Sequence, residues 1–544
     1  MEIDPFRFRR LKLPIANSFA RVLWTVKTDV ELPRGRRFFL LSLGCCLMFS
    51  SIAFGQQRQR DVEASGAAIR AAPVDPAIQR ALGEISPATI QATIEKLVSF
   101  HNRSTLSSID SSIPAGQGVS AAAEWIAAEL GRYSAACGGC LEVKRDTFTQ
   151  TPEPPPQGRI PNPTTITNVY AILRGSDPAQ ASRMVLVTGH YDSRNSDTMN
   201  TQKEAPGAND DASGVAVSLE CARTLSAARM QGLKLPATIV FVAVAGEEQG
   251  LNGSRHLAQL AKSEGWQLEA VLNNDIVGGN TTPGETLQDK SAVRVFSEGI
   301  PAAATPEEVR RITGLGLESD SPSRELARAV ADVGRSYFSG APINLPPQGG
   351  SLGDCKEASF SPPSNCPQTF HPVLIFRRDR YLRGGDHSSF NQEGFAAVRF
   401  TEWREDFNHQ HQDVRVENGV EYGDVLKFVD FDYVANVARL NAAVLATLAA
   451  APAPPVNVRI VTKDLDNSTS LRWSPGAGSA GGSYEIVWRE TSAADWERSI
   501  LIHTADNSPY SYTVPISKDN VIFGIRSVDS AGHRSLAVTP TPER

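Results

Sequence analysis

The chain has 544 residues, of which 41% are hydrophobic, with 54 basic and 60 acidic side chains. At about 100 to 200 residues per domain this length predicts two to four domains, and the composition is that of a folded protein with ample core. Intrinsic disorder, collagen and a multispan membrane protein are excluded. The net charge of −6 argues against a nucleic-acid partner, which would need a basic surface that neutralises phosphates.

The first 55 residues have the pattern of an export signal. Residues 1–37 contain nine Lys or Arg and four Asp or Glu, whereas residues 38–55, FFLLSLGCCLMFSSIAFG, contain no charge. A basic segment followed by an apolar stretch and small residues is typical of a secretory signal, with cleavage expected after Gly55. The alternative is a retained anchor, because the apolar stretch is at the lower limit for crossing a bilayer. We expect a secreted or periplasmic protein, with a membrane partner only if this segment is retained.

The segment after the export signal is acidic overall. Without residues 1–55 the chain has 489 residues with 45 basic and 56 acidic side chains, a net charge near −11. Its first part, residues 56–84, is polar and Ala-rich. This composition predicts a linker or short propeptide without a core of its own.

Export also places the remaining cysteines in an oxidising compartment. Cys137 and Cys140, and likewise Cys355 and Cys366, are close enough in sequence to form disulfides. A redox or metal role for the CGGC motif is the alternative, but no second Cys or His pair accompanies it. Cys221 lies in an Ala- and Leu-rich helical pattern, which predicts a buried apolar residue.

Residues 85–450 alternate between helix and strand patterns. Apolar residues at i, i+3 and i+4 predict two amphipathic helices over 86–100 and 120–135. Helical stretches then separate apolar runs that predict strands: TNVYAILRG, RMVLVTGHY, ATIVFVAVAGEE, EAVLNNDIVG and AAVRFTEWRE. Continuously apolar strands indicate a sheet that is covered on both faces. We therefore expect an α/β domain with a mixed, mostly parallel sheet between layers of helices, and a surface insertion over about 340–370.

A second domain follows the Pro-rich linker APAPP at residues 451–455. Turn signals separate short runs, SLRWSP, SYEIVWRE and VIFGIRSVDSAGHRS, with the spacing of an all-β sandwich. With Trp473 on the second strand and Tyr484 on the third, residues 456–544 resemble a fibronectin type III domain. Val521 stands where that family usually has its corner tyrosine, so the resemblance depends on the rest of the pattern.

Acid and imidazole side chains follow the predicted strands of the α/β domain, where open α/β sheets place their sites. Six motifs carry them: TGHYDS (His190, Asp192), PGANDDASG (Asp210, Asp211), AGEEQG (Glu247, Glu248), NNDIVG (Asp275), GGDHSSF (Asp386, His387) and NHQHQDV (His409, His411, Asp413). A lone acid at a strand end is more often a helix cap or a solvated residue. Six such motifs in one domain favour a functional site.

These residue types suit zinc and hydrolysis. Two His, two Asp and one Glu form a mixed nitrogen and oxygen ligand set, and the H-x-D spacing lets Asp192 fix the tautomer of His190. The adjacent Glu247 and Glu248 allow one acid to bind metal while the other transfers protons. Two close cations can activate a bridging water and polarise a carbonyl, so the predicted reaction is hydrolysis of an amide.

In their order the motifs resemble the two-zinc exopeptidase family that includes bacterial leucine aminopeptidases, glutamate carboxypeptidase and plasma glutamate carboxypeptidase. The resemblance covers roughly residues 85–450. It implies the zinc-peptidase fold and two Zn²⁺ ions held by five ligands: His190, Asp210, Glu248, Asp275 and His409.

The resemblance also assigns the ligands to the two ions. His190 and Asp275 would bind one zinc, Glu248 and His409 would bind the other, and Asp210 would bridge both.

His409 is preferred to His411 because the family pattern commonly reads Tyr-His-Thr-x-x-Asp. Counting back four residues from Asp413 gives His409. Asn408 then occupies the position of the tyrosine, so stabilisation of the oxyanion would come from zinc or another donor.

The catalytic residues implied by the resemblance are Glu247 and Asp192. Glu247 would be the general base that takes a proton from the zinc-bridging water and delivers it to the leaving amine. Asp192 would lie behind His190 and orient it. Asp386 and His387 match a motif beside the site with a less direct role.

The leading interpretation is an exported zinc metallopeptidase, a hydrolase acting as an aminopeptidase at the N-terminus of peptide or protein substrates. A carboxypeptidase or dipeptidase would share every zinc ligand and differ only in the groups that recognise the substrate terminus. Residues 377–405 offer both acids and arginines for that purpose, so the sequence does not decide. The rival from another class is a non-catalytic binding protein, but all five ligand positions and the base are filled. The oligomeric state stays open.

Overall fold

The computed structural model describes most of the chain after the predicted export signal. The described ranges are 66–156, 158–279, 289–338, 370–463, 465–477, 482–504 and 509–543. The signal over residues 1–55, the Cys355 and Cys366 pair, and the predicted insertion up to residue 369 lie outside these ranges. The disulfide between Cys137 and Cys140 is present, and Cys221 is a buried free thiol, as predicted.

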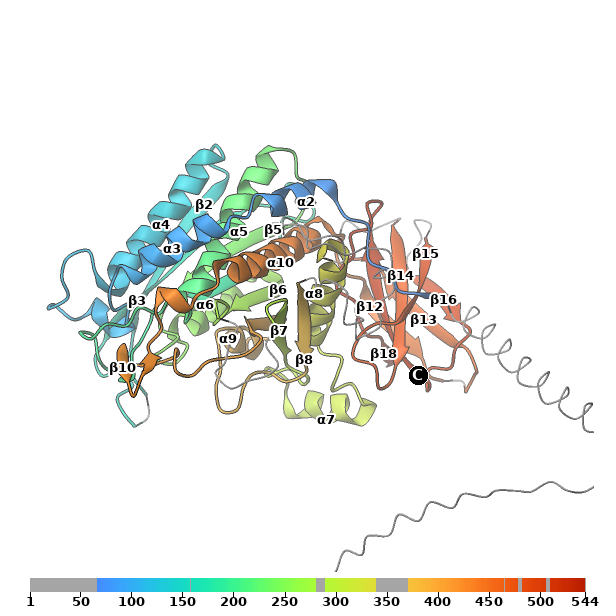
Figure 1. Cartoon of the computed structure of the whole chain (residues 1–544). Coiled ribbons are helices and arrows are strands. Elements are labelled where there is room, and N and C mark those ends of the chain that lie inside the picture. The colour runs from blue at the N-terminus through green and yellow to red at the C-terminus, as the bar shows by residue number, and fades with distance from the viewer. Residues whose placement is uncertain are drawn as a thin grey trace, which may run out of the picture. The chain divides into compact units, whose positions relative to one another are not determined.

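The α/β domain is built around an eight-stranded sheet in the order β2-β3-β5-β4-β6-β9-β7-β8 (Figure 1). Its strands are β2 (Leu141–Gln150), β3 (Thr164–Leu173), β4 (Arg183–His190), β5 (Thr238–Val244), β6 (Gln267–Asn274), β7 (Ala292–Ser297), β8 (His371–Ile375) and β9 (Ala397–Glu402). The neighbouring pairs within β5-β4-β6-β9 are parallel, whereas β2·β3, β3·β5 and β7·β9 are antiparallel. The predicted mixed sheet is therefore confirmed, and every residue of β5 is buried, as its continuous apolar run requires.

Helices cover both faces of this sheet. One shared apolar core joins one face to α2 (Pro76–Gly83), α3 (Pro87–Val98), α4 (Gly118–Ala136), α5 (Ala212–Met230), α8 (Pro322–Phe338) and α10 (Phe431–Ala450). A second core joins the other face to α6 (Asn252–Ser263) and α9 (His387–Gln392). Helix α7 (Pro306–Leu315) buries no residue and lies outside both cores. The three-layer arrangement agrees with the α/β class expected from the alternating pattern.

Helix α10 lies in the centre of the larger helical layer. Asp430 caps its start by accepting a hydrogen bond from the backbone N–H of Tyr433 at 3.1 Å. Of the helices within the described ranges, it alone is long and apolar enough to cross a membrane, but 89% of its most apolar window is buried inside the protein. Asn441 in its middle exchanges two hydrogen bonds, of 3.0 and 2.9 Å, with Asn274 at the end of β6. The helix thus fixes the strand end from which Asp275 follows.

The segment before Ser86 differs from the predicted linker in its second half. Ala67 and Ala68 form the short strand β1 (Ala67–Ala68), which pairs with a strand of the C-terminal region. In α2, Ile78 and Leu82 are fully buried in the main core. The polar, Ala-rich composition of residues 56–84 did not predict this helix, because Ile78 and Leu82 are its only large buried side chains.

The C-terminal region consists of two four-stranded sheets, β1-β15-β14-β17 and β16-β13-β12-β18. Its strands are β12 (Val456–Val461), β13 (Thr469–Ser474), β14 (Ser483–Glu490), β15 (Arg498–His503), β16 (Tyr510–Val514), β17 (Val521–Val528) and β18 (Thr541–Glu543). Trp473, Tyr484 and Tyr510 pack in its core with ring centroids 5.4 to 5.9 Å apart. This β-rich region has the two sheets expected of a sandwich, and its fibronectin type III identity stays a prediction.

Buried ion pairs join this β-rich region to α8. Arg526 on β17 lies 2.8 Å both from Asp332 on α8 and from Glu485 on β14. Arg489 on β14 lies 2.5 Å from Asp320, which precedes α8. All five side chains are less than 9% exposed. Charges at such depth are tolerated only when they are paired, so the β-rich region and the α/β domain are coupled through these contacts.

The pKa of Asp332 reflects this pairing. Burial alone would raise the pKa of its carboxyl, but the guanidinium groups of Arg526, Arg534 and Arg335 lower it to about 2. A depressed carboxyl pKa contributes stability above the ordinary pKa of an aspartate, and that contribution is lost as the pH falls through the folded value.

Replacement of Arg526 should therefore destabilise the whole chain. Arg526→Ala removes the most buried cation of Asp332 and Glu485 and leaves these carboxylates with Arg534, which is 15% exposed and lies 3.2 and 3.0 Å from them. Because this pairing is only partly lost, we expect a loss of about 2 kcal/mol in the free energy of unfolding, measured by urea denaturation. The matched control is Arg472→Ala in the same β-rich region, whose pair with Glu543 is largely exposed and should cost less than about 0.5 kcal/mol. Equal losses in the two variants would contradict the coupling.

Candidate metal centre

The chemistry-bearing residues meet because four neighbouring strands run parallel. His190 is the last residue of β4, and Asp275 follows β6 directly. Glu247 and Glu248 come three and four residues after β5. Because β5, β4 and β6 are parallel neighbours, their carboxyl ends lie at one edge of the sheet. The loop after β4 adds Asp210, two residues before the start of α5.

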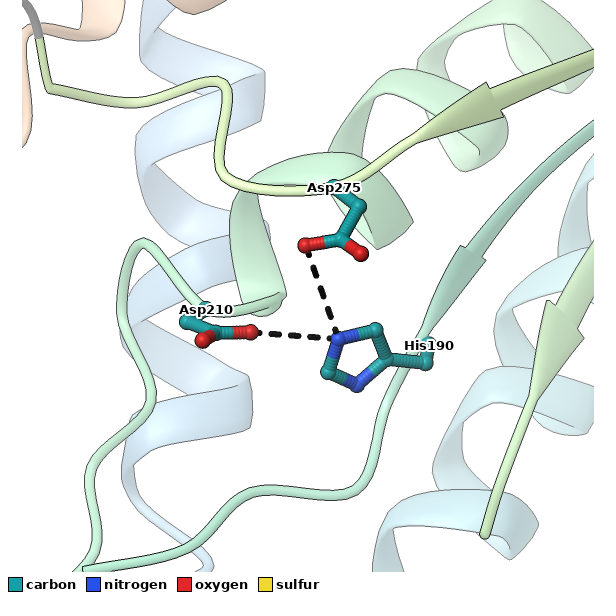
Figure 2. A group of neighbouring side chains, drawn as sticks. All are labelled: His190, Asp210 and Asp275. Carbon is teal, nitrogen blue, oxygen red and sulfur yellow. Dashed lines mark ion pairs between the residues drawn. The ribbon is translucent and has the colours of Figure 1, made fainter. Parts of the chain in front are cut away.

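The first group of potential ligands is His190, Asp210 and Asp275, all at most 5% exposed (Figure 2). His190 Nε2 lies 3.1 Å from Asp210 Oδ1 and 3.9 Å from Asp275 Oδ1. Figure 2 shows both carboxylates pointing at the same ring nitrogen.

The second group is Asp210, Glu248 and His411. His411 Nε2 lies 2.9 Å from Asp210 Oδ2 and 3.2 Å from Glu248 Oε1. Asp210 therefore faces one histidine with each of its two carboxylate oxygens. This shared residue gives the arrangement expected of a bridging ligand between two ions.

Backbone hydrogen bonds hold Asp210 in this position. Asp424, which is buried, accepts the N–H of Asn209 at one carboxylate oxygen and the N–H of Asp210 at the other, both at 2.7 Å. The Asn209 side chain in turn donates to Glu402 at the end of β9 at 2.8 Å. The loop is thus fixed on both sides by carboxylates that do not belong to either group.

Asp211 links the same loop to two strand ends. It caps α5 by accepting the N–H of Gly214 at 2.9 Å, and it accepts the N–H of His190 at 3.0 Å. The N–H of Ile276 also points to it, at 3.3 Å. Adjacent acids therefore divide their roles, because Asp210 faces the histidines while Asp211 serves the backbone.

Asp192 connects His190 to the glutamate pair. His190 Nδ1 lies 3.1 Å from the Asp192 carbonyl and 3.5 Å from its Oδ1. The same carboxylate accepts the N–H of Glu247 at 3.3 Å and that of Glu248 at 3.1 Å, and the hydroxyl of Thr105 at 3.0 Å. This is the position from which a side chain can orient an imidazole without being a ligand.

Glu247 and Glu248 occupy different environments. Glu248 belongs to the second group, whereas Glu247 is partly buried beside the first group without joining either. Burial raises the pKa of Glu247 well above its ordinary value; the His190 imidazole opposes this shift, and the carboxylates of Asp275 and Glu248 add to it. A carboxyl that readily accepts a proton thus lies next to the two groups.

The donor set fits divalent zinc. Each group offers one imidazole nitrogen and two carboxylates, a combination typical of catalytic zinc. Within the described structure, neither His190 Nε2 nor Glu248 Oε1 makes a hydrogen bond of acceptable geometry, although both are buried. Buried carboxylates that face one another need compensating positive charge, which bound cations would supply.

His409, which the sequence analysis chose as a ligand, is outside both groups. Its Nδ1 lies 3.1 Å from Asp406 Oδ2, and its ring stacks on Phe428 with centroids 3.5 Å apart. His411 faces Asp210 instead, so the choice of His409 over His411 was wrong as a description of the geometry.

The error has a physical cause in the course of the loop. The count started from Asp413, but this carboxylate binds the hydroxyl of Ser196 at 2.7 Å and the ammonium of Lys203 at 2.9 Å, and so marks no fixed distance to a ligand. His411 adopts a left-handed backbone conformation with φ of 52°, uncommon for a residue other than glycine, which turns the loop. Two histidines two residues apart gave no signal that distinguished them.

Two buried arginines were missed by the sequence analysis. Arg399 on β9 is fully buried and lies 2.9 Å from Asp275 and 3.2 Å from Asp379. A charged residue inside the apolar run AAVRFTEW was a usable signal, since a buried arginine needs an acidic partner. Arg103 donates to four backbone carbonyls, including those of Tyr191 and Gly207, and so ties together the loops of His190 and Asp210.

The GGDHSSF motif lies against the first group. A Cβ on Gly385 would be 3.1 Å from Asp275 Oδ2 and 2.7 Å from Arg399 Nη1, so a larger residue there would displace the Arg399 guanidinium from its present position. Asp386 is fully buried, and burial raises its pKa to about 7. His387 Nε2 donates to the backbone carbonyl of Arg378 at 2.9 Å. The motif therefore packs against the first ligand group without contributing a ligand to it.

Comparisons with known proteins agree with this geometry. The profile of Peptidase family M28 matches residues 168–315. A probable zinc metalloprotease of Pyrenophora teres f. teres is 42% identical over 474 residues, which are 86% of this chain and 88% of that protein. A probable zinc metalloprotease of Pyricularia oryzae is 44% identical over 485 residues, 88% and 87% of the two chains.

Solved structures resemble the chain at lower identity. The Legionella pneumophila LapA aminopeptidase is 17% identical with a TM-score of 0.41, covering 69% of this chain and 74% of that one. An aminopeptidase from Aneurinibacillus sp. strain AM-1 is 15% identical with a TM-score of 0.40, covering 68% and 95%. The two fungal proteins are more than 40% identical to this chain along most of its length, and the family profile covers the strands that carry the centre. The chain therefore belongs to peptidase family M28 and is a zinc metallopeptidase.

Proposed function

We propose that this metallopeptidase is an exported aminopeptidase that uses two zinc ions to remove residues from the N-terminus of peptides. The observation that carries the two-ion proposal is the pair of ligand groups that share Asp210. In this proposal His190 and Asp275 hold one ion, Glu248 and His411 hold the other, and Asp210 bridges them. Bound zinc supplies Lewis acidity, which polarises the scissile carbonyl and lowers the pKa of the attacking water.

Glu247 is the proposed general base. Its carboxylate takes a proton from the attacking water and delivers it to the nitrogen of the leaving amine. The raised pKa supports this role, because burial favours the protonated form that the residue must hold between the two transfers. Asp192 orients His190 at Nδ1, and its contacts to the N–H groups of Glu247 and Glu248 hold the base relative to the ligands.

The arginines near the metal centre are bound by protein acceptors, and this favours an aminopeptidase over a carboxypeptidase. A substrate carboxylate needs an available cation, whereas a free amine needs an acid. Five described arginines that contact the ligands or their loops are engaged by protein acceptors: Arg103, Arg159, Arg194, Arg383 and Arg399. The surplus of carboxylates at the centre suits a substrate ammonium.

Two observations support export. Residues 1–55 have the pattern of a secretory signal. Cys137 and Cys140 form a disulfide, and disulfides persist mainly in oxidising compartments outside the cytosol.

The substrate terminus can be tested with blocked peptides. We expect the full chain to hydrolyse a tripeptide with a free N-terminus and an amidated C-terminus, and to leave the N-acetylated tripeptide with a free C-terminus intact. A chelator should abolish turnover and zinc should restore it. Cleavage of the acetylated peptide with the amidated one intact would identify a carboxypeptidase instead, and no chelator-sensitive cleavage of any peptide would refute the proposed activity.

The adjacent glutamates should separate chemistry from metal binding. Glu247→Gln should lower kcat roughly 10²- to 10⁴-fold while zinc content stays unchanged, because only proton transfer is lost. Glu248→Gln should lose close to one equivalent of zinc per chain, measured by elemental analysis after dialysis, because it removes a charged ligand. Equal zinc loss in both variants would contradict the division of roles.

The two histidines provide a matched pair for the second ion. His411→Ala should lower both zinc content and activity, since its Nε2 faces Asp210 and Glu248. His409→Ala should keep both ions, because its ring contacts Asp406 and Phe428 rather than a ligand. If His411→Ala kept two zinc ions and His409→Ala lost one, the ligand would be His409, as the family pattern counted back from Asp413 predicts, and the assignment of His411 would be wrong.

A further inference from the structure

Exposed apolar side chains concentrate beside the proposed catalytic centre. Of the thirteen large apolar residues that are exposed among the described ones, six lie within residues 381–420: Tyr381, Leu382, Phe407, Val414, Val416 and Val420. Single exposed apolar residues are common, but a concentration on neighbouring segments indicates a contact surface. Tyr381 at 84% and Leu382 at 107% are among the most exposed of all.

A buried carboxylate holds the loop that carries Tyr381 and Leu382. Arg380 and Arg383, on either side of these two residues, lie 2.9 and 3.1 Å from the same oxygen of Glu405. Glu405 also pairs with Arg294 on β7 at 2.7 Å, and its side chain is 6% exposed. Burial alone would raise the pKa of Glu405, but the guanidinium groups of Arg380, Arg399 and Arg294 lower it to about 2, so the carboxylate stays ionised. The base of the loop is therefore fixed while its tip extends into solvent.

The tip of this loop, at Leu382, has an unfavourable backbone conformation. Leu382 has φ of 52°, in the left-handed region that is unfavourable for a branched side chain. This conformation costs free energy, and the exposed leucyl side chain gains none from burial in return. Such outliers persist mainly where the conformation serves a ligand or a partner.

The tip is continuous with the metal centre. Gly385, three residues after Leu382, packs so closely on Asp275 that an added Cβ would lie 3.1 Å from its carboxylate. The Arg383 guanidinium donates to the side chain of Gln410 at 3.4 Å, next to His411, and lies over the Phe407 ring at 5.6 Å. The loop and Phe407 thus border both ligand groups.

We propose that Tyr381, Leu382 and Phe407 form an apolar lip that binds an apolar side chain of the peptide substrate on the leaving side of the scissile bond. The inference rests on the proposed aminopeptidase activity and specifies its substrate class. A peptide whose first residue lies at the ligand groups extends over the bordering surface, so the lip contacts the residues that follow. The enzyme therefore prefers peptides with large apolar residues in the second or third position.

The test compares two free-N-terminus tripeptide amides with the same first residue, one continuing with Leu-Phe and one with Ser-Gly. Wild-type enzyme should hydrolyse the Leu-Phe peptide with roughly tenfold higher kcat/KM, the effect of partly burying one large side chain. Leu382→Ser and Phe407→Ser should each reduce this ratio severalfold through KM, with zinc content unchanged. The matched control is Leu465→Ser, at an equally exposed leucine of the β-rich region, which should keep the wild-type ratio.

The possible outcomes separate the lip from the activity on which it rests. Hydrolysis of both peptides with the same ratio in wild type and lip variants would overturn the lip and leave the aminopeptidase proposal standing. Absence of hydrolysis of either peptide by wild type would overturn both. A lip variant that changes oligomeric state by light scattering while keeping the wild-type ratio would assign this surface to self-association and overturn the peptide role.

Discussion

The structure depends on the placement of several carboxylates within a few ångströms of one another inside the protein. At an effective dielectric constant near 20, two like charges 4 Å apart repel by about 4 kcal/mol. Asp210, Glu248 and Asp275 can therefore converge only where positive charge converges with them. The imidazoles of His190 and His411 and the guanidinium of Arg399 supply part of it, and bound zinc is the remaining source that the family chemistry provides.

A second set of residues holds the loops that bring these ligands together. Arg103 binds the backbone carbonyls of Pro206 and Gly207 just before Asp210, while Asp424 binds two N–H groups of the same loop. Asp192 does the same for the glutamate pair. These polar side chains bind the main chain, so they hold in place loops that lack the hydrogen-bond ladder of regular secondary structure.

The sequence contained enough information for the sheet, for the ends of its central strands and for four of the residues that the structure brings into the two groups. Apolar runs give the ends of β4, β5 and β6 directly, because a strand buried on both faces ends where polarity begins. The histidine of the last loop could not be predicted. Its direction depends on a left-handed turn at His411 and on contacts of Asp413 with residues more than 200 positions away. Helix α2 was missed for a related reason, since its burial arises from tertiary packing.

Arginine is the internal cation that this fold uses throughout. Among the described residues, seven arginines and no lysine are buried, at the metal centre, in the loops around it and at the junction with the β-rich region. A lysine at such depth would tend to lose its proton, whereas burial lowers the pKa of Arg103 only to about 10, so it stays charged at neutral pH. The fork of the guanidinium also lets one residue serve two acceptors, as Arg526 does with Asp332 and Glu485. An acidic chain can therefore keep reactive carboxylates at its centre because the arginines that pair with its buried acids stay charged over the pH range in which carboxylates and imidazoles titrate.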